Sequence, residues 1–369
     1  MDWDEPIDSG PVPASGSQFD VIVVGGGPGG SATATYMAMK GAKVLLLEKA
    51  SWPRDKTCGD AVGGKSLKHV EELGVKPILE KTPHFRVDAI VFGSPNNKEV
   101  RIALPEDEVE NREAGYSLPR KQFDTLLFRN ATEKVLGAGG SVIQKFLVKE
   151  VHVENESVTG VTGTHGGEIL NFNAPITIGA GGYTCPVARA ITRHHDEPMV
   201  DKWHYCDAYR EYWTGVEGCE DWKGAIEIHF IDGVVPGYFW IFPVGNGVVN
   251  VGIGMVIGER EKEKTKLKKL QKWVIEESPK FKKRFANAEM VPRTGKAWQL
   301  PFGSPRKSAP SFQPRRSAMG GAICVGDAAS LVDPFTGEGI GNALLSAKLA
   351  STVFDLKIHQ DGFTKESAD

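Results

Sequence analysis

Hydrophobic and polar positions in the first fifty residues predict a strand, a helix and a second strand in succession. Val21 to Val24 is an apolar, β-branched run of the kind that forms a strand buried on both faces of a parallel sheet. A glycine-rich turn follows, and then a helix of small residues from Ser31 to Lys40, which Gly41 ends. A second apolar run, Lys43 to Leu47, predicts the next strand. This order is typical of the βαβ unit of an α/β domain.

Alternating apolar and polar positions predict a second kind of sheet in the middle of the chain. Residues 84–105 alternate in strand fashion and turn at Asn96-Asn97, so we expect a hairpin there. A helix is predicted for 121–135, a strand and hairpin for 142–169, and a buried strand with a following helix for 176–193. The spacing of Arg120 and Asp124 places them on one helical face, where an ion pair at the surface is the simplest expectation.

The most aromatic part of the chain predicts a further hairpin with two different faces. Strands at 238–242 and 248–255 flank a Gly-Asn-Gly turn. Because successive side chains of a strand point to opposite faces, Tyr238, Trp240 and Phe242 share one face and the residues between them share the other. Both faces are large and apolar, so we expect one to fill a core and the other to form an aromatic wall that a layer or a ligand covers.

The glycine-rich turn after the first strand carries the first candidate chemistry. Gly25, Gly27 and Gly30 fit the pattern G-x-G-x-x-G, and Glu48 follows Gly30 by 18 residues at the end of the second strand. The glycines allow a tight turn, a close approach of a pyrophosphate and close packing of helix on strand. The free N–H groups at the helix start bind phosphate, and the acid accepts hydrogen bonds from a ribose. The sequence therefore predicts a dinucleotide site.

A second stretch, Ala322 to Ala350, predicts another ligand-binding helix start some 300 residues later. A buried strand ends in the sharp turn Gly326-Asp327-Ala328, whose carboxylate is placed to reach a polyol. The loop from Pro334 to Gly339 then opens a small-residue helix whose N–H groups face an anion or an electron-rich ring edge. A plain nicotinamide dehydrogenase does not need this second cradle. FAD does, because its flavin and ribitol require binding groups of their own.

Composition narrows the class of protein. The net charge of −3 and a pI near 6.3 argue against a general nucleic-acid binder. The five cysteines are scattered without a C-x-x-C pair, so we expect no disulfide framework, no metal site and a reducing, cytoplasmic location. No apolar run is long enough to span a bilayer. Residues 1–18 lack the features of a secretory signal and are expected to form a disordered tail.

Two polar segments add further candidates. The loop at 51–67 follows the second strand at the sheet edge where ligands bind, and it carries Arg54, Cys58 and Gly59. The segment 260–285 holds eleven Lys or Arg against four Glu, a local charge of +7, around a helical stripe of apolar residues. Two interpretations of this helix stay open. It packs on the sheet of the protein as an ordinary solvated helix, or it makes peripheral contact with an anionic membrane surface.

Together these stretches resemble the geranylgeranyl reductase family, within the larger set of p-hydroxybenzoate-hydroxylase-like flavoproteins, over about residues 19 to 355. The βαβ start and the turn at Asp327 are shared by the whole set. The narrower marks are 53–59, the aromatic box 238–243 and 334–340. The resemblance implies an FAD enzyme that saturates C=C bonds in the prenyl chain of a lipid, a quinone or a prenyl diphosphate. It leaves NADPH and ferredoxin open as electron donors.

The resemblance also implies roles for individual residues. Arg54, Cys58 and Gly59 would lie by the flavin, and Arg120 by the phosphates or the adenosine half. Cofactor contacts are expected from Gly25, Gly27, Gly29, Gly30, Glu48, Lys49, Arg54, Cys58, Gly59, Arg120, Gly326, Asp327, Pro334, Gly337, Gly339 and Ile340. Substrate contacts are expected from Tyr238, Trp240, Phe242 and Pro243, and catalytic roles from Cys58, Tyr238 and Trp240. An isolated alkene needs a proton as well as a hydride, so the aromatic rings would stabilise developing positive charge.

The expected fold is α/β with an α+β part. A discontinuous Rossmann-like FAD-binding domain comprises 19–83, 118–199 and 293–369, and an antiparallel-sheet substrate domain comprises 84–117 and 200–292. Two departures from the family keep alternatives open. The pair Gly181-Gly182 stands where hydroxylases of the wider set carry Asp-Gly, and the chain ends at Asp369 in a polar tail where family members continue into helices. The alternatives are a flavin-dependent monooxygenase or halogenase, and a non-catalytic flavoprotein.

Overall fold

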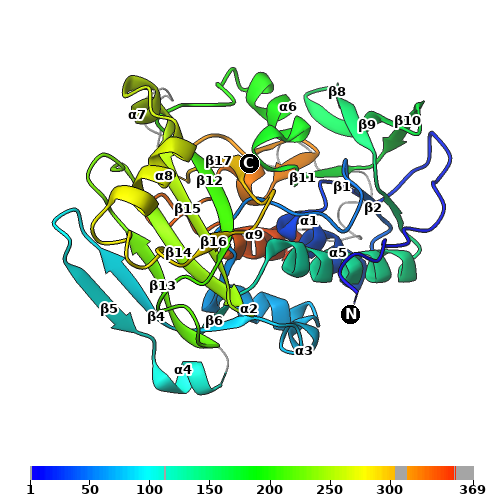
Figure 1. The fold of residues 1–369 in the computed structure, drawn as a ribbon. Coiled ribbons are helices and arrows are strands. Elements are labelled where there is room, and N and C mark those ends of the chain that lie inside the picture. Colours follow the sequence, from blue (N-terminus) through cyan, green and yellow to red (C-terminus); the bar gives the residue numbers. More distant parts are fainter. Residues whose placement is uncertain (1, 112–113, 304–313, 353, 355–369) are drawn as a thin grey trace.

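Two sheet-based parts lie side by side in the computed structural model, which describes residues 2–111, 114–303, 314–352 and 354 (Figure 1). One part is built on a six-stranded, mainly parallel sheet and the other on a ten-stranded sheet. The chain passes between them several times, so neither part is one continuous segment. The polar tail predicted to end the chain lies outside the described residues.

The six-stranded sheet has the order β18-β19-β11-β1-β2-β7. Its strands are β1 (Val21–Val24), β2 (Val44–Leu47), β7 (Ser141–Ile143), β11 (Ile176–Gly179), β18 (Ala318–Met319) and β19 (Ala322–Cys324). All pair in parallel except β18, which runs antiparallel to β19. Every residue of β1 is buried, as its uninterrupted apolar run predicts.

Layers cover both faces of this sheet. Val21 and Val23 pack toward the helices α1 (Pro28–Met39), α5 (Arg120–Gly137) and α9 (Ile340–Thr352). Ile22 and Val24 pack toward the other face, against a three-stranded sheet and a helix. These covering elements are β8 (Leu147–Glu154), β9 (Ser157–His165), β10 (Glu168–Asn173) and α6 (Pro186–His194). Helices α2 (Gly64–Glu72) and α3 (Lys76–Leu79) add to the helical layer.

The ten-stranded sheet has the order β16-β12-β15-β14-β13-β4-β6-β3, with β17 also paired to β12 and β5 to β4. Its strands are β3 (Ala61–Gly63), β4 (Phe85–Gly93), β5 (Glu99–Ala103), β6 (Gly115–Ser117), β12 (Tyr205–Thr214), β13 (Lys223–His229), β14 (Gly237–Gly245), β15 (Val248–Val256), β16 (Glu289–Met290) and β17 (Lys296–Pro301). The short helices α4 (Glu106–Glu110) and α7 (Ile257–Lys262) join its strands.

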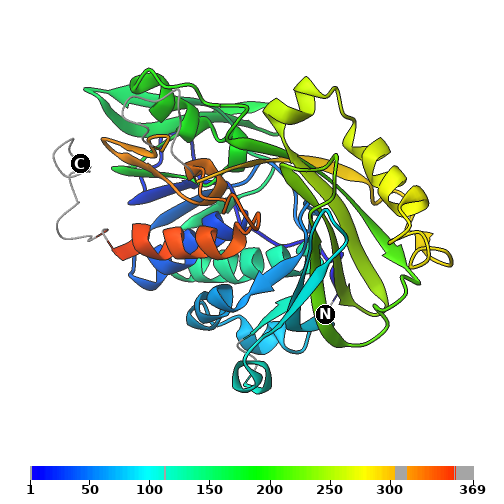
Figure 2. The ribbon, with the colours of Figure 1, turned by 90° about the vertical axis from the view of Figure 1, so that its left-hand side faces the viewer.

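Helix α8 (Leu267–Glu277) lies on the outer face of the ten-stranded sheet, on the side away from α9 (Figure 2). Its apolar residues Leu267, Val274 and Ile275 are buried against Phe239 and its neighbours of the sheet. The predicted apolar stripe of the basic segment is therefore occupied by the protein itself. Its lysines, including Lys268, Lys269 and Lys272, remain exposed.

Three expectations about the fold need correction. The ten-stranded sheet is not wholly antiparallel, because β13 and β4 pair in parallel. Strands β3 and β17, assigned by sequence to the FAD-binding part, belong to this sheet by their hydrogen bonds. Residues 2–18 are not a free tail: Ile7 is buried in a core, and its carbonyl accepts a hydrogen bond from Gln144 (2.7 Å). These contacts offset the chain entropy that composition alone suggested would prevail.

Within the described residues, no helix is long and apolar enough to cross a membrane.

Candidate functional site

A cavity of about 950 Å³ lies between the two parts of the molecule. The carboxyl ends of β1, β2 and β19 form one end of its wall, which is where ligands bind in open α/β sheets. Tyr238, Trp240 and Phe242 of β14 line another region of the same wall. The loop between β2 and β3, which contains Cys58, lies between these two regions and contributes to the lining.

The turn from β1 into α1 provides a cradle that only glycine permits. Gly25 has φ of +112°, and a Cβ there would collide with the carbonyl of Ala180. A Cβ on Gly30 would collide with the carbonyl of Gly25, so this glycine serves the packing of the turn. Gly27 and Gly29 line the cavity at the start of α1. The backbone is thus open to a ligand phosphate at the helix N-terminus.

Glu48 closes this cradle at the end of β2. The carboxylate is only 5% exposed. Its Oε2 accepts a hydrogen bond from the Gly26 N–H (2.7 Å), and its Oε1 accepts one from the Ala50 N–H (2.8 Å). Each carboxylate oxygen retains a second acceptor site. The side chain is therefore fixed in place and still able to bind two hydroxyl groups of a ribose.

A second cradle forms where β19 leads into the short helix Gly326–Ala329 and where α9 begins. Asp327, Gly337, Gly339 and Ile340 all line the cavity. Gly337 has φ of +72°, and a Cβ there would collide with the Tyr238 hydroxyl. The N-terminus of the 13-residue α9 is thus brought against the aromatic strand. Both predicted helix starts open into the same cavity.

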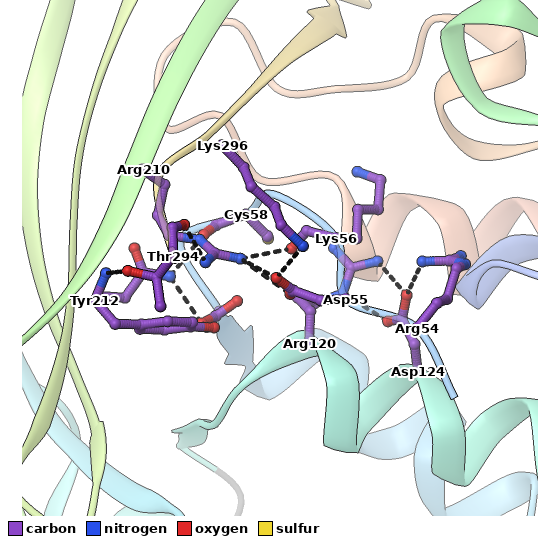
Figure 3. A network of polar contacts seen from close by, with 12 residues as sticks. Arg54, Asp55, Lys56, Cys58, Arg120, Asp124, Arg210, Tyr212, Thr294 and Lys296 are labelled. Carbon is purple, nitrogen blue, oxygen red and sulfur yellow. Dashed lines mark hydrogen bonds and ion pairs between the residues drawn. The ribbon is translucent and has the colours of Figure 1, made fainter. Parts of the chain in front are cut away.

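The Arg120–Asp124 pair is buried rather than exposed at the surface. Arg120 is 3% and Asp124 1% exposed. The guanidinium binds the carboxylate with Nε–Oδ1 at 2.6 Å and Nη2–Oδ2 at 2.9 Å, and Arg54 approaches the same carboxylate at 3.3 Å. The surface ion pair expected from the spacing is therefore wrong, because the N-terminus of α5 lies beneath the cavity loop (Figure 3). Such bidentate pairs hold an arginine in one orientation.

A second charged cluster ties the cavity loop to the ten-stranded sheet. Arg210 of β12 donates to Asp55 (3.0 Å) and to the Lys56 carbonyl (3.0 Å), and Lys296 of β17 binds the other oxygen of Asp55 (2.8 Å). Figure 3 shows these side chains converging on the loop. Arg210 is fully buried, so its charge depends on Asp55 for compensation. The loop is thereby fixed between α5 and β12.

The aromatic wall is held by polar contacts at its edges. The Tyr238 hydroxyl donates to the Thr336 carbonyl, and the Trp240 Nε1–H donates to Asn250 Oδ1 (2.8 Å). The ring centroid of Trp240 lies 6.0 Å from that of Tyr238 and 6.5 Å from that of Phe242. The indole also lies against Gly252 of β15, where a Cβ would overlap the ring. The wall is therefore a rigid row of rings.

A buried acid lies below this wall. Asp60 is 0% exposed and lines the cavity. Its Oδ2 accepts hydrogen bonds from the Tyr212 hydroxyl and from Asn250 Nδ2 (2.7 Å). Burial raises the pKa of the Asp60 carboxyl to about 6, against the opposing effects of Arg210, these two hydrogen bonds and Arg120.

Most of the residues selected from the sequence line this one cavity. They are Gly25, Gly27, Gly29, Glu48, Lys49, Arg54, Cys58, Gly59, Arg120, Tyr238, Trp240, Phe242, Gly326, Asp327, Gly337, Gly339 and Ile340. Gly30, Pro243 and Pro334 do not belong to the lining. Gly30 packs on the turn, Pro243 is buried in β14 and Pro334 is exposed on its loop.

Sequence reasoning missed Asp60, Arg210, Tyr212 and Asn250. The available signal was polar residues in strands that are otherwise apolar or aromatic, such as Asn250 within Val248–Val256. A buried polar residue needs partners, and here the partners come from segments more than 150 residues away.

Comparison with known proteins agrees with this geometry. Residues 18–351 match the model of the FAD binding domain family. The chain is 30% identical to digeranylgeranylglycerophospholipid reductase 1 of Methanococcoides burtonii, over 95% of this chain and 77% of that protein. It is 28% identical to a menaquinone reductase of Mycobacterium tuberculosis, over 91% of this chain and 76% of that one.

Solved structures give the same result for the fold. A geranylgeranyl bacteriochlorophyll reductase-like protein from Thermoplasma acidophilum superposes with a TM-score of 0.76 at 26% identity, over 95% of this chain and 81% of that one. The flavin-dependent brominase Bmp2 has a TM-score of 0.72 at 20% identity, over 91% of this chain and 78% of that one, and so shares the fold.

Proposed function

The chain belongs to the geranylgeranyl reductase family of FAD-binding oxidoreductases, and we propose that it saturates C=C bonds in the prenyl chain of a lipid, a quinone or a prenyl diphosphate. The observation that carries this proposal is that one cavity joins two glycine-hinged helix starts to a row of aromatic rings. The first feature suits a dinucleotide cofactor. The second suits a long apolar substrate.

Residues of both cradles would hold the FAD. The start of α1 at Gly27 would bind the pyrophosphate and Glu48 the ribose, because both present free hydrogen-bonding groups to the cavity. Asp327 would bind the ribitol, and Gly337 to Gly339 the edge of the flavin ring. When bound and reduced, FAD supplies a hydride. Either NADPH or ferredoxin would provide its electrons.

The wall residues would position the alkene and stabilise charge on it. An isolated double bond is not polarised, so addition of hydride requires protonation that gives cationic character to one carbon. Aromatic faces stabilise a nearby cation by about 0.5–2 kcal/mol each. Tyr238, Trp240 and Phe242 present such rings to the cavity, and the backbone approach at Gly59 leaves room for them. Cys58, on the same loop, would lie by the flavin.

The test uses purified protein loaded with FAD and reduced by dithionite without oxygen. Substrates are offered in parallel: a geranylgeranylated glycerophospholipid, menaquinone and geranylgeranyl diphosphate. Mass increases in steps of two hydrogens on one of these support the proposal. A monooxygenase or halogenase would instead consume oxygen in step with product, and a non-catalytic flavoprotein would bind FAD without altering any prenyl chain. Either result overturns the proposal.

Peripheral membrane contact is part of the proposal, through the exposed basic side of α8. The apolar stripe of this helix is buried, so contact would be electrostatic, with Trp273 (47% exposed) at the interface. Lysines near an anionic surface contribute about 1 kcal/mol each. We expect the double change Lys268→Glu and Lys269→Glu to weaken sedimentation with phosphatidylglycerol vesicles by tenfold or more.

The control for this prediction is Lys134→Glu, an exposed lysine on α5. It should leave binding to phosphatidylglycerol vesicles nearly unchanged. Replacement of the anionic lipid by phosphatidylcholine should weaken binding of every variant and remove the difference between them. Equal binding of the double variant and the unaltered protein would rule out this surface as the contact and leave the reductase proposal untouched.

A further inference from the structure

We infer that the carboxyl group of Asp60 is the proton donor for saturation of the double bond, an inference that rests on the proposed function. Neither the sequence motifs nor the comparisons assign a role to this residue. The reaction needs an acid in contact with the cavity, and Asp60 is a fully buried acid in the cavity lining.

The backbone holds Asp60 at a defined place. Its φ is +70°, a left-handed conformation that Asp adopts more readily than most residues. The residue follows Gly59 directly, and a Cβ on Gly59 would lie 2.8 Å from the Phe242 ring. The amide of Leu118 donates to the Asp60 carbonyl (3.1 Å). The carboxyl is therefore anchored immediately beside the aromatic wall.

The two carboxyl oxygens have different environments. Oδ2 accepts from Tyr212 and Asn250, whereas Oδ1 is buried and has no hydrogen-bond partner among the residues that the structure describes. A buried acceptor without a partner is costly. The cost falls if Oδ1 carries a proton and donates it to a group in the cavity. The hydrogen bonds thus leave one oxygen for the transferable proton.

Asn250 links this acid to the ring proposed to stabilise the cation. Its Oδ1 accepts from Trp240 Nε1 (2.8 Å), and its Nδ2 donates to the Cys58 carbonyl (2.7 Å) as well as to Asp60. Asn250 is completely buried, so these bonds fix its position. Proton source and cation-stabilising ring are consequently held in one rigid unit. Asn250 is a positioning residue in this arrangement.

The surrounding charges keep Asp60 an acid of intermediate strength. Arg210 and Tyr212 face it from β12, Asn250 from β15 and Arg120 from α5. Arg210, which is hydrogen-bonded to Asp55 and to the Lys56 carbonyl, is the strongest of these groups in favouring the carboxylate, but burial outweighs it and keeps the pKa of Asp60 raised. Tyr238 is a weaker choice, because burial raises its pKa and its hydroxyl already donates to Thr336.

Saturation of the double bond adds one hydride and one proton. One alkene carbon forms a C–H bond with a hydride from the reduced flavin, and the other forms a C–H bond with the proton of Asp60 Oδ1–H. The double bond becomes a single bond, and the flavin is oxidised by two electrons. Asp60 is left as a carboxylate, which recovers a proton from solvent. Two electrons from the donor, delivered together by NADPH or one at a time by ferredoxin, would then restore the reduced flavin.

Asp60→Asn tests this step, because the amide keeps the shape and the acceptor oxygen but has no acidic proton. The rate at which the reduced flavin is reoxidised by a prenyl substrate without oxygen should fall at least 100-fold. FAD affinity and thermal stability at pH 4, where Asp60 is protonated in the folded chain and about half protonated in the unfolded chain, should change little. The matched control is Asp88→Asn, which removes a carboxylate of β4 that is paired with Arg101 of β5 (2.8 Å), and this change should leave the rate unchanged.

Infrared spectroscopy gives a readout independent of turnover. A protonated-carboxyl band that titrates near pH 6 should be present in the unaltered protein and in Asp88→Asn, and absent from Asp60→Asn. If no prenyl substrate is reduced by any variant, the proposed function fails while this band still reports the buried acid. If the unaltered protein reduces the substrate and Asp60→Asn does so within threefold, the inference about Asp60 is overturned.

Tyr212→Phe is a second variant in case Asp60→Asn binds FAD poorly. It removes a hydrogen bond that favours the carboxylate, so the pKa of Asp60 should rise. The rate, which requires the protonated acid, should then persist to higher pH than in the unaltered protein. An unshifted pH profile would overturn the inference.

Discussion

Glu227 and Asp60 are acids on opposite faces of the ten-stranded sheet, the first partly buried and the second fully buried. Glu227 lies on the core face, where Arg284 binds both of its oxygens (2.7 and 2.8 Å) and His229 contacts one of them (2.8 Å). Burial opposes ionisation there, but these partners prevail and lower the pKa of Glu227 to about 2. On the cavity face, burial prevails and raises the pKa of Asp60 to about 6.

The difference lies in the charge of the hydrogen-bond donors. A guanidinium in direct contact favours a carboxylate strongly, whereas a tyrosine hydroxyl and an amide favour it weakly. Glu227 therefore stays ionised and stabilises the fold as an anion, whereas Asp60 retains a proton that it can donate. Pairs of acids whose pKa values diverge in this way are a recurring sign of an acid's role in chemistry.

The two faces of β14 offer the largest contrast. Phe239 is fully buried on the core face, and its ring lies 5.0 Å from that of Phe281, so Phe239→Ala should cost about 3–5 kcal/mol of unfolding free energy. Trp240→Ala, its neighbour on the cavity face, should lower turnover about tenfold through loss of cation stabilisation. Urea unfolding and kcat per bound FAD separate the two effects. Equal effects of the two variants on turnover would break the contrast.

Glu227→Gln should cost about 3 kcal/mol of unfolding free energy, because Arg284 is left largely buried without its anion. The turnover of the folded, FAD-loaded protein should stay within threefold of the unaltered rate. A larger loss of turnover would mean that the core face takes part in the chemistry. Denaturant unfolding and steady-state kinetics on one preparation supply both numbers.

The two acids should also give opposite pH dependences of stability. The raised pKa of Asp60 adds stability below the pKa of the unfolded chain, and this stability is lost as pH rises through about 6. The lowered pKa of Glu227 adds stability at neutral pH that is lost as pH falls toward 2. The free energy of unfolding of Asp60→Asn, relative to that of the unaltered protein, should therefore increase by about 2–3 kcal/mol as pH rises from 4 to 7.5. A constant difference across that range would contradict the raised pKa.

Sequence reasoning succeeded where the pattern is local. The run Val21–Val24, the glycine turn and the hairpin with two faces all depend on neighbours in the chain, and the structure confirms each. The aromatic residues of the hairpin divide as the period-two pattern predicts: Trp240 lines the cavity and Phe239 fills the core. Periodicity was sufficient because each face of this hairpin has one kind of neighbour.

Contacts between segments that lie far apart in the sequence could not be predicted from local patterns. The Asp60 cluster brings together a loop, β12 and β15, and Arg54 of the same loop donates a hydrogen bond to the buried Arg120–Asp124 pair. The packing of residues 2–18 likewise depends on Gln144 and Asn171. None of these partners follows from spacing, since each is fixed by how the two parts of the molecule meet.

The close contact of Trp240 with Gly252 limits how the width of the cavity can change by substitution. Any side chain at position 252 must displace the indole, and with it the hydrogen bond to Asn250. A substitution that changes the width of the cavity at position 252 would therefore also move the ring that is proposed to stabilise positive charge. A variant that accepts a wider or narrower substrate chain would have to change the cavity elsewhere. Ile226 and Ile228 of the neighbouring strand β13 also line the cavity and are examples of such positions.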